Sequence, residues 1–571
     1  MRRISQRIFL LVLLASFSLS GLAKDVVHDA EYYILKMQNG ERWAAEDKEL
    51  NAKLAALREK YGTPPNIIYL LWDDTAFGAV GFPGLQKNFG YETPNINKMA
   101  AEGINFTRMY TEPSCTPTRA AFLTGRIPVR HGMGVVGMPH EYSGLRAEEV
   151  TIAEVLSEGG YATAFYGKGH LGDIEESYLH NQGFDDALFT PMNQITSLYN
   201  PQGNAVNAVL GLHPEIYPPD PYRLDSPGLN PEGWVMSIEG TKGGEAREWC
   251  GTSNECYAKM DAEAESRTLA FIRKNAKAGK PFFVSYWPNF LNFMPTSPRK
   301  NSVAGLMVPD AMPKLDAFIG TVMAELKKLD IAENTIFVAM ADNGPMVHSP
   351  PTGWGMLPMI YRGGKGDFTE GGVRTPAFAW WPGTIKPQVV GDIVHVTDLY
   401  TTFARLGNAT RHIPRDRVVD GLDQTALLMK GDTFSRRDYV FIYAGHQLGA
   451  TVKGRYKRHW IGAGDVAASG MPEAYYDLYM DPREENPQLV PLIHTQGQFN
   501  KMVARHELFK KKYPDAENGK GIPYTGLVNA RPETKAIATR VKATMEVMPF
   551  DVEDYLEFDI PGSDSVGDWG Q

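Results

Sequence analysis

The segment NIIYLLWDD, from Asn66 to Asp74, decides the fold. Its first seven residues are almost all apolar, which is typical of a strand buried on both faces of a parallel sheet. Similar runs recur as YATAFYG from Tyr161, PFFVSYW from Pro281, TIFVAMADNG from Thr335 and TPAFAWWPG from Thr375. Helix-like segments separate several of these runs. This alternation predicts an α/β fold with a doubly wound, mostly parallel central sheet flanked by helices.

Further regions surround the predicted sheet, which belongs to a main domain over residues 63–430. Residues 24–62 are rich in Ala, Glu, Lys and Leu at helical spacing, and this predicts an N-terminal helical arm. From about 190 to 248 the chain is dense in Pro, Gly, Asn and Tyr without a clear period. We therefore expect an insertion near 190–256 that adds no element to the sheet. Residues 431–571 combine short strand-like runs with charged helical stretches, so we predict a smaller C-terminal α+β subdomain.

The composition of the 571 residues excludes several classes of protein. With 43% hydrophobic and 22% charged residues, the chain is not largely disordered, collagen-like or a coiled coil. The 58 basic and 67 acidic residues give a net charge of −9, which argues against a general binder of nucleic acid or anionic membranes. An anionic substrate therefore needs a local basic pocket.

The N-terminus has the pattern of a targeting segment. Arg2, Arg3 and Arg7 precede an apolar run from about Ile8 to Leu22, which ends among small residues. This order predicts a cleaved signal peptide over residues 1–23, with an uncleaved anchor as the alternative. Because the run is short for a membrane span, we expect a soluble exported protein, periplasmic or secreted, without a stable membrane anchor.

The chain has three cysteines, so in an exported protein one of them is left without a disulfide partner within the chain. Cys250 and Cys256 are separated by turn-forming residues in WCGTSNECY, so they make a plausible disulfide in an oxidising compartment. Cys115 remains. The commonest role of a free cysteine is that of a small buried apolar side chain.

Cys115 lies in EPSCTPTRAAFLTGR, residues 112–126, where Cys115, Pro117 and Arg119 have the spacing C-x-P-x-R. This segment resembles the sulfatase family, in which the pentapeptide directs oxidation of the cysteine to formylglycine (3-oxoalanine). The resemblance runs from about Asn66 to Gly383 through several separate motifs. It implies an enzyme that hydrolyses a sulfate monoester to an alcohol and inorganic sulfate. It also implies a formylglycine-generating enzyme as a transient partner.

The position of Cys115 carries its own physical argument. A residue between a loop and a helix lies beside unpaired backbone N–H groups and the positive end of the helix dipole, which favour a sulfate or phosphate there. The same surroundings can activate a thiol. Acyl transfer by a Cys-His pair is therefore the mechanistic alternative to formylglycine chemistry.

Oxygen-bearing side chains follow two of the predicted strands. Asp73 and Asp74 end the first, and Asp342 and Asn343 end the strand in ADNG. Such donors suit a hard cation, Ca²⁺ or Mg²⁺, and strand ends in an open α/β sheet are where ligands bind. Taken alone, an Asp-Asp pair is more often a turn or helix cap. The resemblance implies that these four residues hold calcium against the sulfate and the formylglycine at Cys115.

Basic side chains complete the resemblance. YGKGHLG is similar to the family motif K-x-H-L-G, which implies that Lys168 and His170 contact the formylglycine hydroxyl and the sulfate. Lys365, in RGGKGDFTEGGVRTP, matches a family lysine that contacts the sulfate and the leaving-group oxygen. Arg119 is expected to steady the nucleophile. Together these cations would stabilise a dianionic transition state.

One position departs from the family pattern. Where sulfatases often have a histidine, this chain has Asn292, with Asn289 as the second candidate for that position. An asparagine can hydrogen-bond a sulfate or leaving oxygen, but it cannot supply a proton by changing its charge. We therefore expect Asn292 to bind substrate, and we expect His170, Lys365 or water to assist the departing alcohol.

Two alternative functions remain open. A phosphonate monoester or phosphodiester hydrolase would use a similar nucleophile beside oxygen-ligated metals. A catalytically silent protein could instead bind sulfated carbohydrate through the aromatic residues of the insertion, which are Tyr199, Tyr217, Tyr222 and Trp234. The sequence leaves the natural ester open, whether a sulfated polysaccharide, an aryl sulfate or a sterol-like sulfate.

Overall fold

The structure is a computed structural model of the 571-residue chain. It describes residues 25–89, 91–137, 143–192, 237–251, 254–289, 297–298, 307–308, 311–345, 359–461, 474–488 and 493–517. The predicted signal peptide, Asn292 and the four aromatic residues of the insertion lie outside these ranges.

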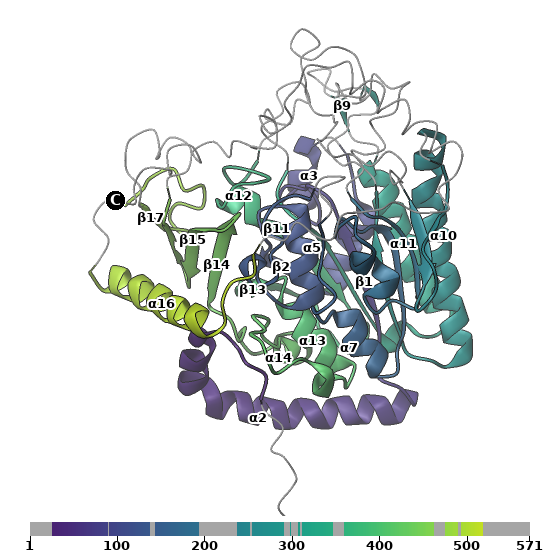
Figure 1. The fold of residues 1–571 in the computed structure, drawn as a ribbon, viewed down its shortest axis with the longest axis horizontal. Coiled ribbons are helices and arrows are strands. Elements are labelled where there is room, and N and C mark those ends of the chain that lie inside the picture. The colour runs from purple at the N-terminus through teal and green to yellow at the C-terminus, as the bar shows by residue number, and fades with distance from the viewer. Residues whose placement is uncertain are drawn as a thin grey trace, which may run out of the picture.

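One large sheet forms the centre of the main domain (Figure 1), with the strand order β12-β2-β11-β10-β1-β7-β3-β4-β5-β6, in which β12 spans Gln388–Val390. The neighbours β10, β1, β7, β3 and β4 are mutually parallel, which confirms the predicted mostly parallel sheet. These five strands span Thr335–Ala341, Asn66–Trp72, Phe282–Trp287, Ala162–Lys168 and Asp186–Thr190. Four of them coincide with the apolar runs quoted above, whereas β4 was not predicted.

Helices cover both faces of the sheet because its central strands are apolar on both sides. In β1, Ile68 and Leu70 pack in one core cluster, and Tyr69 and Leu71 pack in the other. The first cluster contains side chains of α4 (Pro94–Glu102), α10 (Asn254–Ala278) and α11 (Ala311–Lys328). The second contains side chains of α5 (Cys115–Thr124), α7 (Ile152–Glu158) and α13 (Asp398–Leu406). Each fully buried side chain of this size stabilises the fold by about 1.5–3 kcal/mol.

The edges of the sheet differ from the predicted arrangement. β11 (Arg374–Trp380) pairs antiparallel with β10 and with β2 (Ile104–Tyr110). At the other edge β5 (Ile238–Thr241) and β6 (Arg247–Glu248) extend the sheet beyond β4. The prediction that residues 190–248 add nothing to the sheet was therefore wrong. These edge strands are short and mostly polar, and backbone pairing rather than an apolar pattern defines them.

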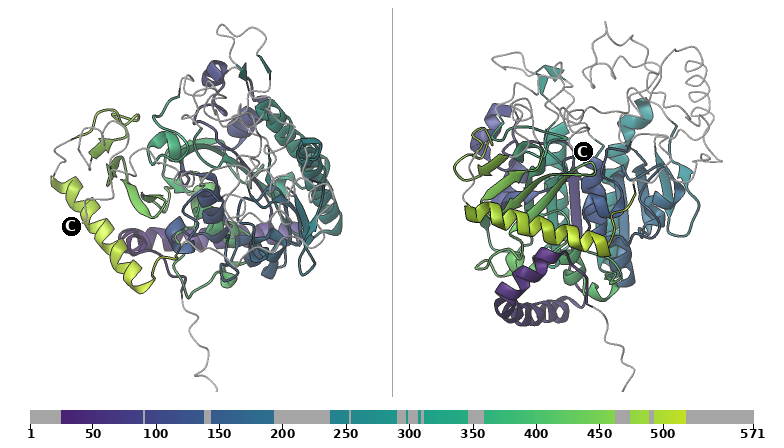
Figure 2. Two further views of the ribbon diagram at one scale, coloured as in Figure 1. Left: turned by 45° about the horizontal axis from the view of Figure 1, so that its top comes forward. Right: turned by 60° about the vertical axis from the view of Figure 1, so that its left-hand side comes forward.

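The first part of the N-terminal arm packs against the C-terminal subdomain, and the rest of the arm runs along the base of the main domain (Figures 1 and 2). The arm is α2 (Ala30–Tyr61), whose Leu35 and Trp43 share a core cluster with Phe499 and Met502 of α16 (Ile493–Lys512). The C-terminal sheet is antiparallel in the order β14-β15-β16-β17. Its strands span Tyr439–Ala444, Gln447–Lys453, Tyr456–His459 and Ala474–Asp477. This small sheet with its helix confirms the predicted α+β subdomain.

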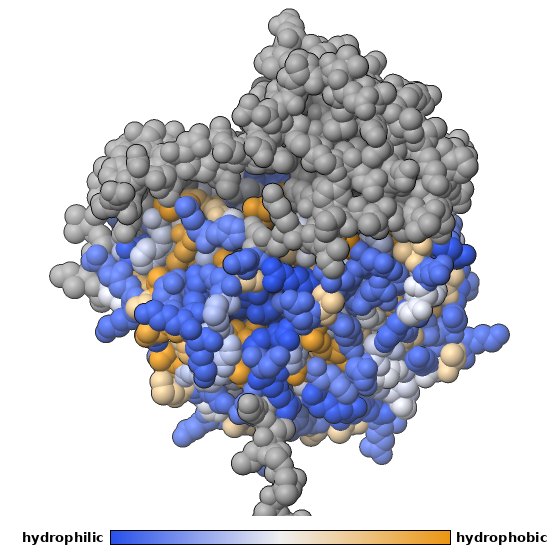
Figure 3. Space-filling view, viewed as in Figure 1, coloured by the Kyte–Doolittle hydropathy of each residue, from blue (hydrophilic) through white to orange (hydrophobic). Residues whose placement is uncertain are grey.

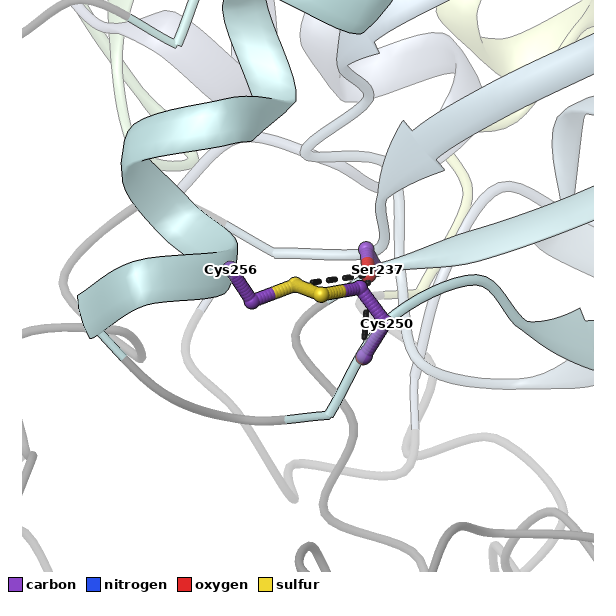
Figure 4. The surroundings of a disulfide bond; sticks show 3 residues. All are labelled: Ser237, Cys250 and Cys256. Atoms are coloured by element: carbon purple, nitrogen blue, oxygen red, sulfur yellow. Dashed lines mark hydrogen bonds between the residues drawn. A yellow bond between two sulfur atoms is a disulfide. The ribbon is translucent and has the colours of Figure 1, made fainter.

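A disulfide joins Cys250 and Cys256, whose Cα atoms are 5.8 Å apart, as the sequence predicts (Figure 4). The hydroxyl of Ser237 donates a hydrogen bond to the carbonyl oxygen of Cys250 at 3.3 Å. The bridge links the end of β6 to the first turn of α10.

The described surface has no broad apolar face in the view of Figure 3, where apolar side chains are interspersed with hydrophilic ones. In the described part of the chain, no helix combines the length and the apolar character needed to cross a membrane.

Candidate active site

Polar side chains gather at one edge of the main sheet. Asp73 follows β1, Asp342 follows β10, and Lys168 is the last residue of β3. Because β10, β1, β7 and β3 are adjacent and parallel, their carboxyl ends lie along the same edge. The strand order thus brings together side chains that are far apart in the sequence.

Arg119 ties these strand ends together from helix α5. Its Nη2 donates hydrogen bonds to Asp73 Oδ1 and, at 2.8 Å, to Asp342 Oδ2. Its Nη1 donates to the carbonyl oxygen of Lys168 at 2.9 Å. The guanidinium carbon lies 5.0 Å from the ring centroid of Trp287, the last residue of β7. Fully buried, Arg119 therefore contacts the ends of four neighbouring strands.

Two lysines and an asparagine engage the aspartates of β1. Lys168 Nζ lies 2.7 Å from Asp73 Oδ2. Lys365 Nζ lies 3.0 and 3.1 Å from the two carboxylate oxygens of Asp74. Asn343 Nδ2 donates to Asp74 Oδ1 at 2.6 Å. The predicted cations and the predicted oxygen donors thus form one connected cluster.

Cys115 is the first residue of α5 and is fully buried. Burial alone would raise the pKa of its thiol, but the positive charges of Lys168 and Lys365 outweigh burial and hold this pKa well below its ordinary value. A helix N-terminus adds to the same effect. Negative charge that develops at position 115 is therefore stabilised by its surroundings.

Two residues of the cluster have unusual backbone conformations. Asp74 has a backbone φ of 44° and His170 one of 54°, values that residues other than glycine rarely adopt. His170 Nε2 lies 2.8 Å from the carbonyl oxygen of Gly137, and its ring interacts electrostatically with the Cys115 thiol. Burial lowers the pKa of His170 below its ordinary value, while the interaction with Cys115 acts in the opposite direction.

Glycines allow the Lys365 loop to approach the strand ends. A Cβ atom on Gly344, in ADNG, would lie 1.8 Å from the carbonyl oxygen of Gly371. Instead, the Gly344 N–H donates to the carbonyl oxygen of Gly372 at 2.8 Å. Only glycine permits this contact, and the contact brings residues 359–373 against the end of β10.

Comparisons with known proteins agree with this arrangement. The family model described as Sulfatase matches residues 65–409, more than half of the chain.

The chain belongs to the sulfatase family.

Human arylsulfatase A is 34% identical to this sulfatase over 455 residues, which cover 74% of the chain and 82% of the human protein. The dog N-acetylgalactosamine-6-sulfatase is 32% identical over 70% of the chain and 72% of its own length. Among solved structures, the PsFucS1 sulfatase from Pseudoalteromonas sp. has a TM-score of 0.71 and 31% identity, covering 83% of this chain and 96% of that one. The protein is accordingly a sulfuric-ester hydrolase.

The donor set of this sulfatase fits a hard cation in its chemistry. Asn343 Oδ1 is buried and makes no hydrogen bond within the described part of the chain. Burial and the negative charge of Asp73 raise the pKa of Asp342 well above its ordinary value, a cost that a nearby cation would relieve. In the described residues no three His, Cys, Asp or Glu side chains already converge as a metal site, because the carboxylates pair with Arg119, Lys168 and Lys365.

Some residues at this edge of the sheet were not predicted from the sequence. Trp287 could have been found because it ends a predicted parallel strand, where ligand-side residues gather. Asn289, the second candidate for the family histidine, is fully buried and accepts a hydrogen bond from Thr190 at 3.2 Å. Asp261 of α10 accepts the Asn289 N–H at 2.6 Å, and no sequence pattern indicated this contact.

Replacing Asp261 with asparagine should change how stability depends on pH. Burial raises the pKa of Asp261 to about 7, so between about pH 4 and 7 the folded protein holds a proton that the unfolded chain releases. The free energy of unfolding therefore falls as pH rises through this window. Asp261→Asn keeps an acceptor for Asn289 and removes the charge, so it should stabilise the protein by up to about 4 kcal/mol at pH 8.

Thermal melting of both proteins at pH 4, 6 and 8 would measure this effect. We expect the gain in melting temperature of Asp261→Asn to grow from pH 4 to pH 8. A gain of the same size at all three pH values would contradict the assignment of the effect to Asp261 ionisation.

Proposed function

We propose that this sulfatase hydrolyses a sulfate monoester to an alcohol and inorganic sulfate through formylglycine formed from Cys115. The observation that carries the proposal is the position of Cys115. It is fully buried at the N-terminus of α5, beside the charges of Lys168 and Lys365. Formylglycine would supply a hydroxyl nucleophile at that position.

In this proposal each side chain of the cluster has a defined task. Arg119 holds Asp73 and Asp342 in place and keeps the end of β3 beside them. Asp342, which Arg119 holds at the end of β10, is the candidate proton acceptor at the nucleophile. Burial and the charges of Lys168 and Arg119, acting in opposite directions, leave the pKa of Asp73 below its ordinary value.

The remaining basic side chains would bind the sulfate. Lys168 and His170 come from the end of β3 and the residues after it, next to Cys115. Lys365 reaches Asp74 from the loop before α12 and would also contact the leaving oxygen. Water, His170 or Lys365 would then protonate the departing alcohol. Asn292 is proposed to bind substrate and lies outside the described residues.

A divalent cation belongs to the same proposal. Asp73, Asp74, Asp342, Asn343 and the modified Cys115 would hold Ca²⁺, with Mg²⁺ as the alternative. The cation would act as a Lewis acid on the sulfate oxygens. A count of formal charges supports it: three carboxylates face the three cations Arg119, Lys168 and Lys365, which leaves no surplus positive charge for a sulfate.

Chelation of divalent cations should therefore inactivate the enzyme. We expect a loss of activity on the order of 100-fold, because a Lewis acid contributes several kcal/mol to transition-state stabilisation. Adding Ca²⁺ back should restore activity and raise the melting temperature, since a ligand at 100 times its Kd stabilises the fold by about 2.7 kcal/mol. Asn343→Ala should weaken both responses. Full activity in the chelated protein would contradict the proposed cation.

The test of the formylglycine proposal is the mass of the peptide that contains Cys115, from protein made in its own host. Formylglycine would appear as a loss of about 18 Da relative to the thiol form, without reaction with an alkylating agent. An alkylatable thiol in an active preparation would overturn the proposal and favour cysteine hydrolase chemistry.

We also propose that the protein is exported, to the periplasm or beyond the cell, after removal of residues 1–23. The basic and apolar pattern of that segment and the Cys250–Cys256 disulfide support this location. A formylglycine-generating enzyme would act on it transiently. Its substrate would be a sulfated small molecule or polysaccharide, in keeping with the arylsulfatase and N-acetylgalactosamine-6-sulfatase names of its relatives.

A further inference from the structure

A group of buried charges connects the C-terminal sheet to the loop that carries Lys365. We call residues 359–370 the Lys365 loop. Lys457 of β16 has its Nζ 3.1 Å from Glu370 Oε1 and 3.0 Å from Glu484 Oε1. His459 Nε2 lies 2.7 Å from the same oxygen of Glu484. All four side chains are fully buried. Buried ion pairs of this kind are weak evidence for a purely stabilising role.

Two consecutive residues of the C-terminal subdomain bind the backbone on either side of Lys365. Arg483 Nη1 donates to the carbonyl oxygens of Met359 at 2.8 Å and Ile360 at 3.2 Å, which precede Lys365 in the sequence. Glu484 Oε2 accepts the backbone N–H of Glu370 at 2.6 Å, which follows Lys365. Glu484 itself has φ of 54°. Such a conformation persists only where the surrounding contacts fix it.

Apolar packing reinforces this connection. Phe368, near the end of the loop, is 4% exposed and belongs to the same core cluster as Val440 and Val452 of the C-terminal sheet. Its ring stands edge-on to His459, with the ring centroids 5.0 Å apart. A Cβ atom on Gly449 would lie 2.8 Å from the Phe368 ring, so glycine there gives the ring its space. Figure 1 shows α12 (Glu370–Val373), which follows the loop, beside this sheet.

Lys365 lies between Met359, which Arg483 binds, and Glu370, which Glu484 binds. Its backbone N–H donates to the carbonyl oxygen of Pro345 at 2.8 Å, and the next N–H, of Gly366, donates to Pro113 at 2.7 Å. Its ammonium then reaches both oxygens of Asp74. Before α12 the loop contains no helix or strand, so regular backbone hydrogen bonding does not fix its shape. The placement of this ammonium therefore depends on individual contacts, both those of Lys365 and Gly366 and those that hold the backbone on either side of them.

We propose that Arg483, Glu484 and Lys457 are positioning residues, which fix the Lys365 ammonium against Asp74 and the substrate sulfate. The inference rests on the proposed role of Lys365 and assigns the C-terminal subdomain a part in catalysis. We assign none of the three a catalytic role, because they contact the loop, one another, His459 and Glu485 rather than the reacting groups.

A double-mutant cycle tests the inference on the full-length, modified enzyme, with 4-nitrophenyl sulfate as substrate. Glu484→Gln and Lys365→Ala are measured singly and together. We expect Glu484→Gln alone to lower kcat/KM by about 10- to 100-fold, because displacement of a catalytic group by about 1 Å costs up to 100-fold. In the Lys365→Ala background the same change should cost less than about twofold, since it acts through Lys365.

Three further variants guard against a general loss of folding. Arg483 is 43% exposed in its side chain, so Arg483→Gln should fold normally and still lower kcat/KM several-fold. Lys453→Met is the matched control for Lys457→Met. Lys453 lies on the neighbouring strand β15 and also pairs with two carboxylates, Glu31 and Asp438, but neither belongs to the Lys365 loop. Its replacement should leave kcat/KM within about twofold of wild type.

Each outcome is decisive. If Glu484→Gln costs the same factor with and without Lys365, or if Lys453→Met and Lys457→Met behave alike at equal melting temperature, the inference is overturned. If Lys365→Ala itself leaves kcat/KM unchanged, the proposed role of Lys365 is wrong, and the inference that rests on it fails for that separate reason.

Discussion

Cys115→Ala should abolish sulfate-ester hydrolysis, with a fall in kcat on the order of 10⁵- to 10⁶-fold, the effect of removing a covalent nucleophile. The side chain is fully buried at the start of α5, and alanine occupies the same space without a reactive atom. The melting temperature should therefore change little. Hydrolysis of 4-nitrophenyl sulfate and thermal melting, measured on one preparation, would separate loss of chemistry from loss of folding.

Ser114→Ala provides the matched control for this change. Ser114 is the adjacent residue, is 7% exposed, and its hydroxyl makes no hydrogen bond within the described part of the chain. Its replacement should keep kcat within about threefold of wild type. Cys115→Ala is expected to keep the ability to bind a sulfated carbohydrate even though it cannot hydrolyse it. Turnover by this variant near the wild-type rate would exclude Cys115 as the origin of the nucleophile.

Arg119→Met should destabilise the protein by about 3–5 kcal/mol and also inactivate it. Arg119 is the partner of two fully buried carboxylates, Asp73 and Asp342, and removal of one side of a buried charge pair leaves the other uncompensated. Asp73 keeps Lys168 as a partner, so most of the cost should fall on Asp342. Denaturant titration measures the stability, and activity is compared well below the melting temperature.

Arg126→Met is the control that separates the loss of stability from the loss of activity. Arg126 also pairs with a buried carboxylate, Glu149, and donates to the carbonyl oxygen of Val418 at 3.0 Å, away from the strand ends. This variant should lose stability but keep kcat within about threefold. An Arg119→Met protein that melts like wild type would show that Arg119 does not compensate the charges of Asp73 and Asp342.

The sequence could predict the centre of the fold because the central strands are runs of apolar residues, and several of these runs end in charged side chains. Asp73, Lys168 and Asp342 could be grouped from the sequence alone, since parallel strands present their carboxyl ends to one edge. The direction of β11 could not be predicted, because an apolar run reads the same in a parallel or antiparallel strand. The contribution of β5 was missed because only one of its two faces is buried.

The connection to the C-terminal sheet could not be predicted from the sequence for another reason. Arg483 and Glu484 lie in DPREENP, which reads as an exposed charged turn. Their partners in the Lys365 loop are more than 100 residues away, and no periodic pattern relates the two segments. Complementary charges at such separations become visible only when the chain is folded.

The complete burial of Cys115 limits the time at which the proposed oxidation can occur. The contacts around it join residues up to 291 positions apart, and such long-range contacts form late, because closing a long loop costs chain entropy before any contact repays it. Until they form, the thiol remains open to the modifying enzyme that we propose; afterwards the folded sheet and α5 enclose it. On the proposed mechanism, oxidation of Cys115 and folding would therefore compete kinetically, and a chain that folded before oxidation would be stable but inactive.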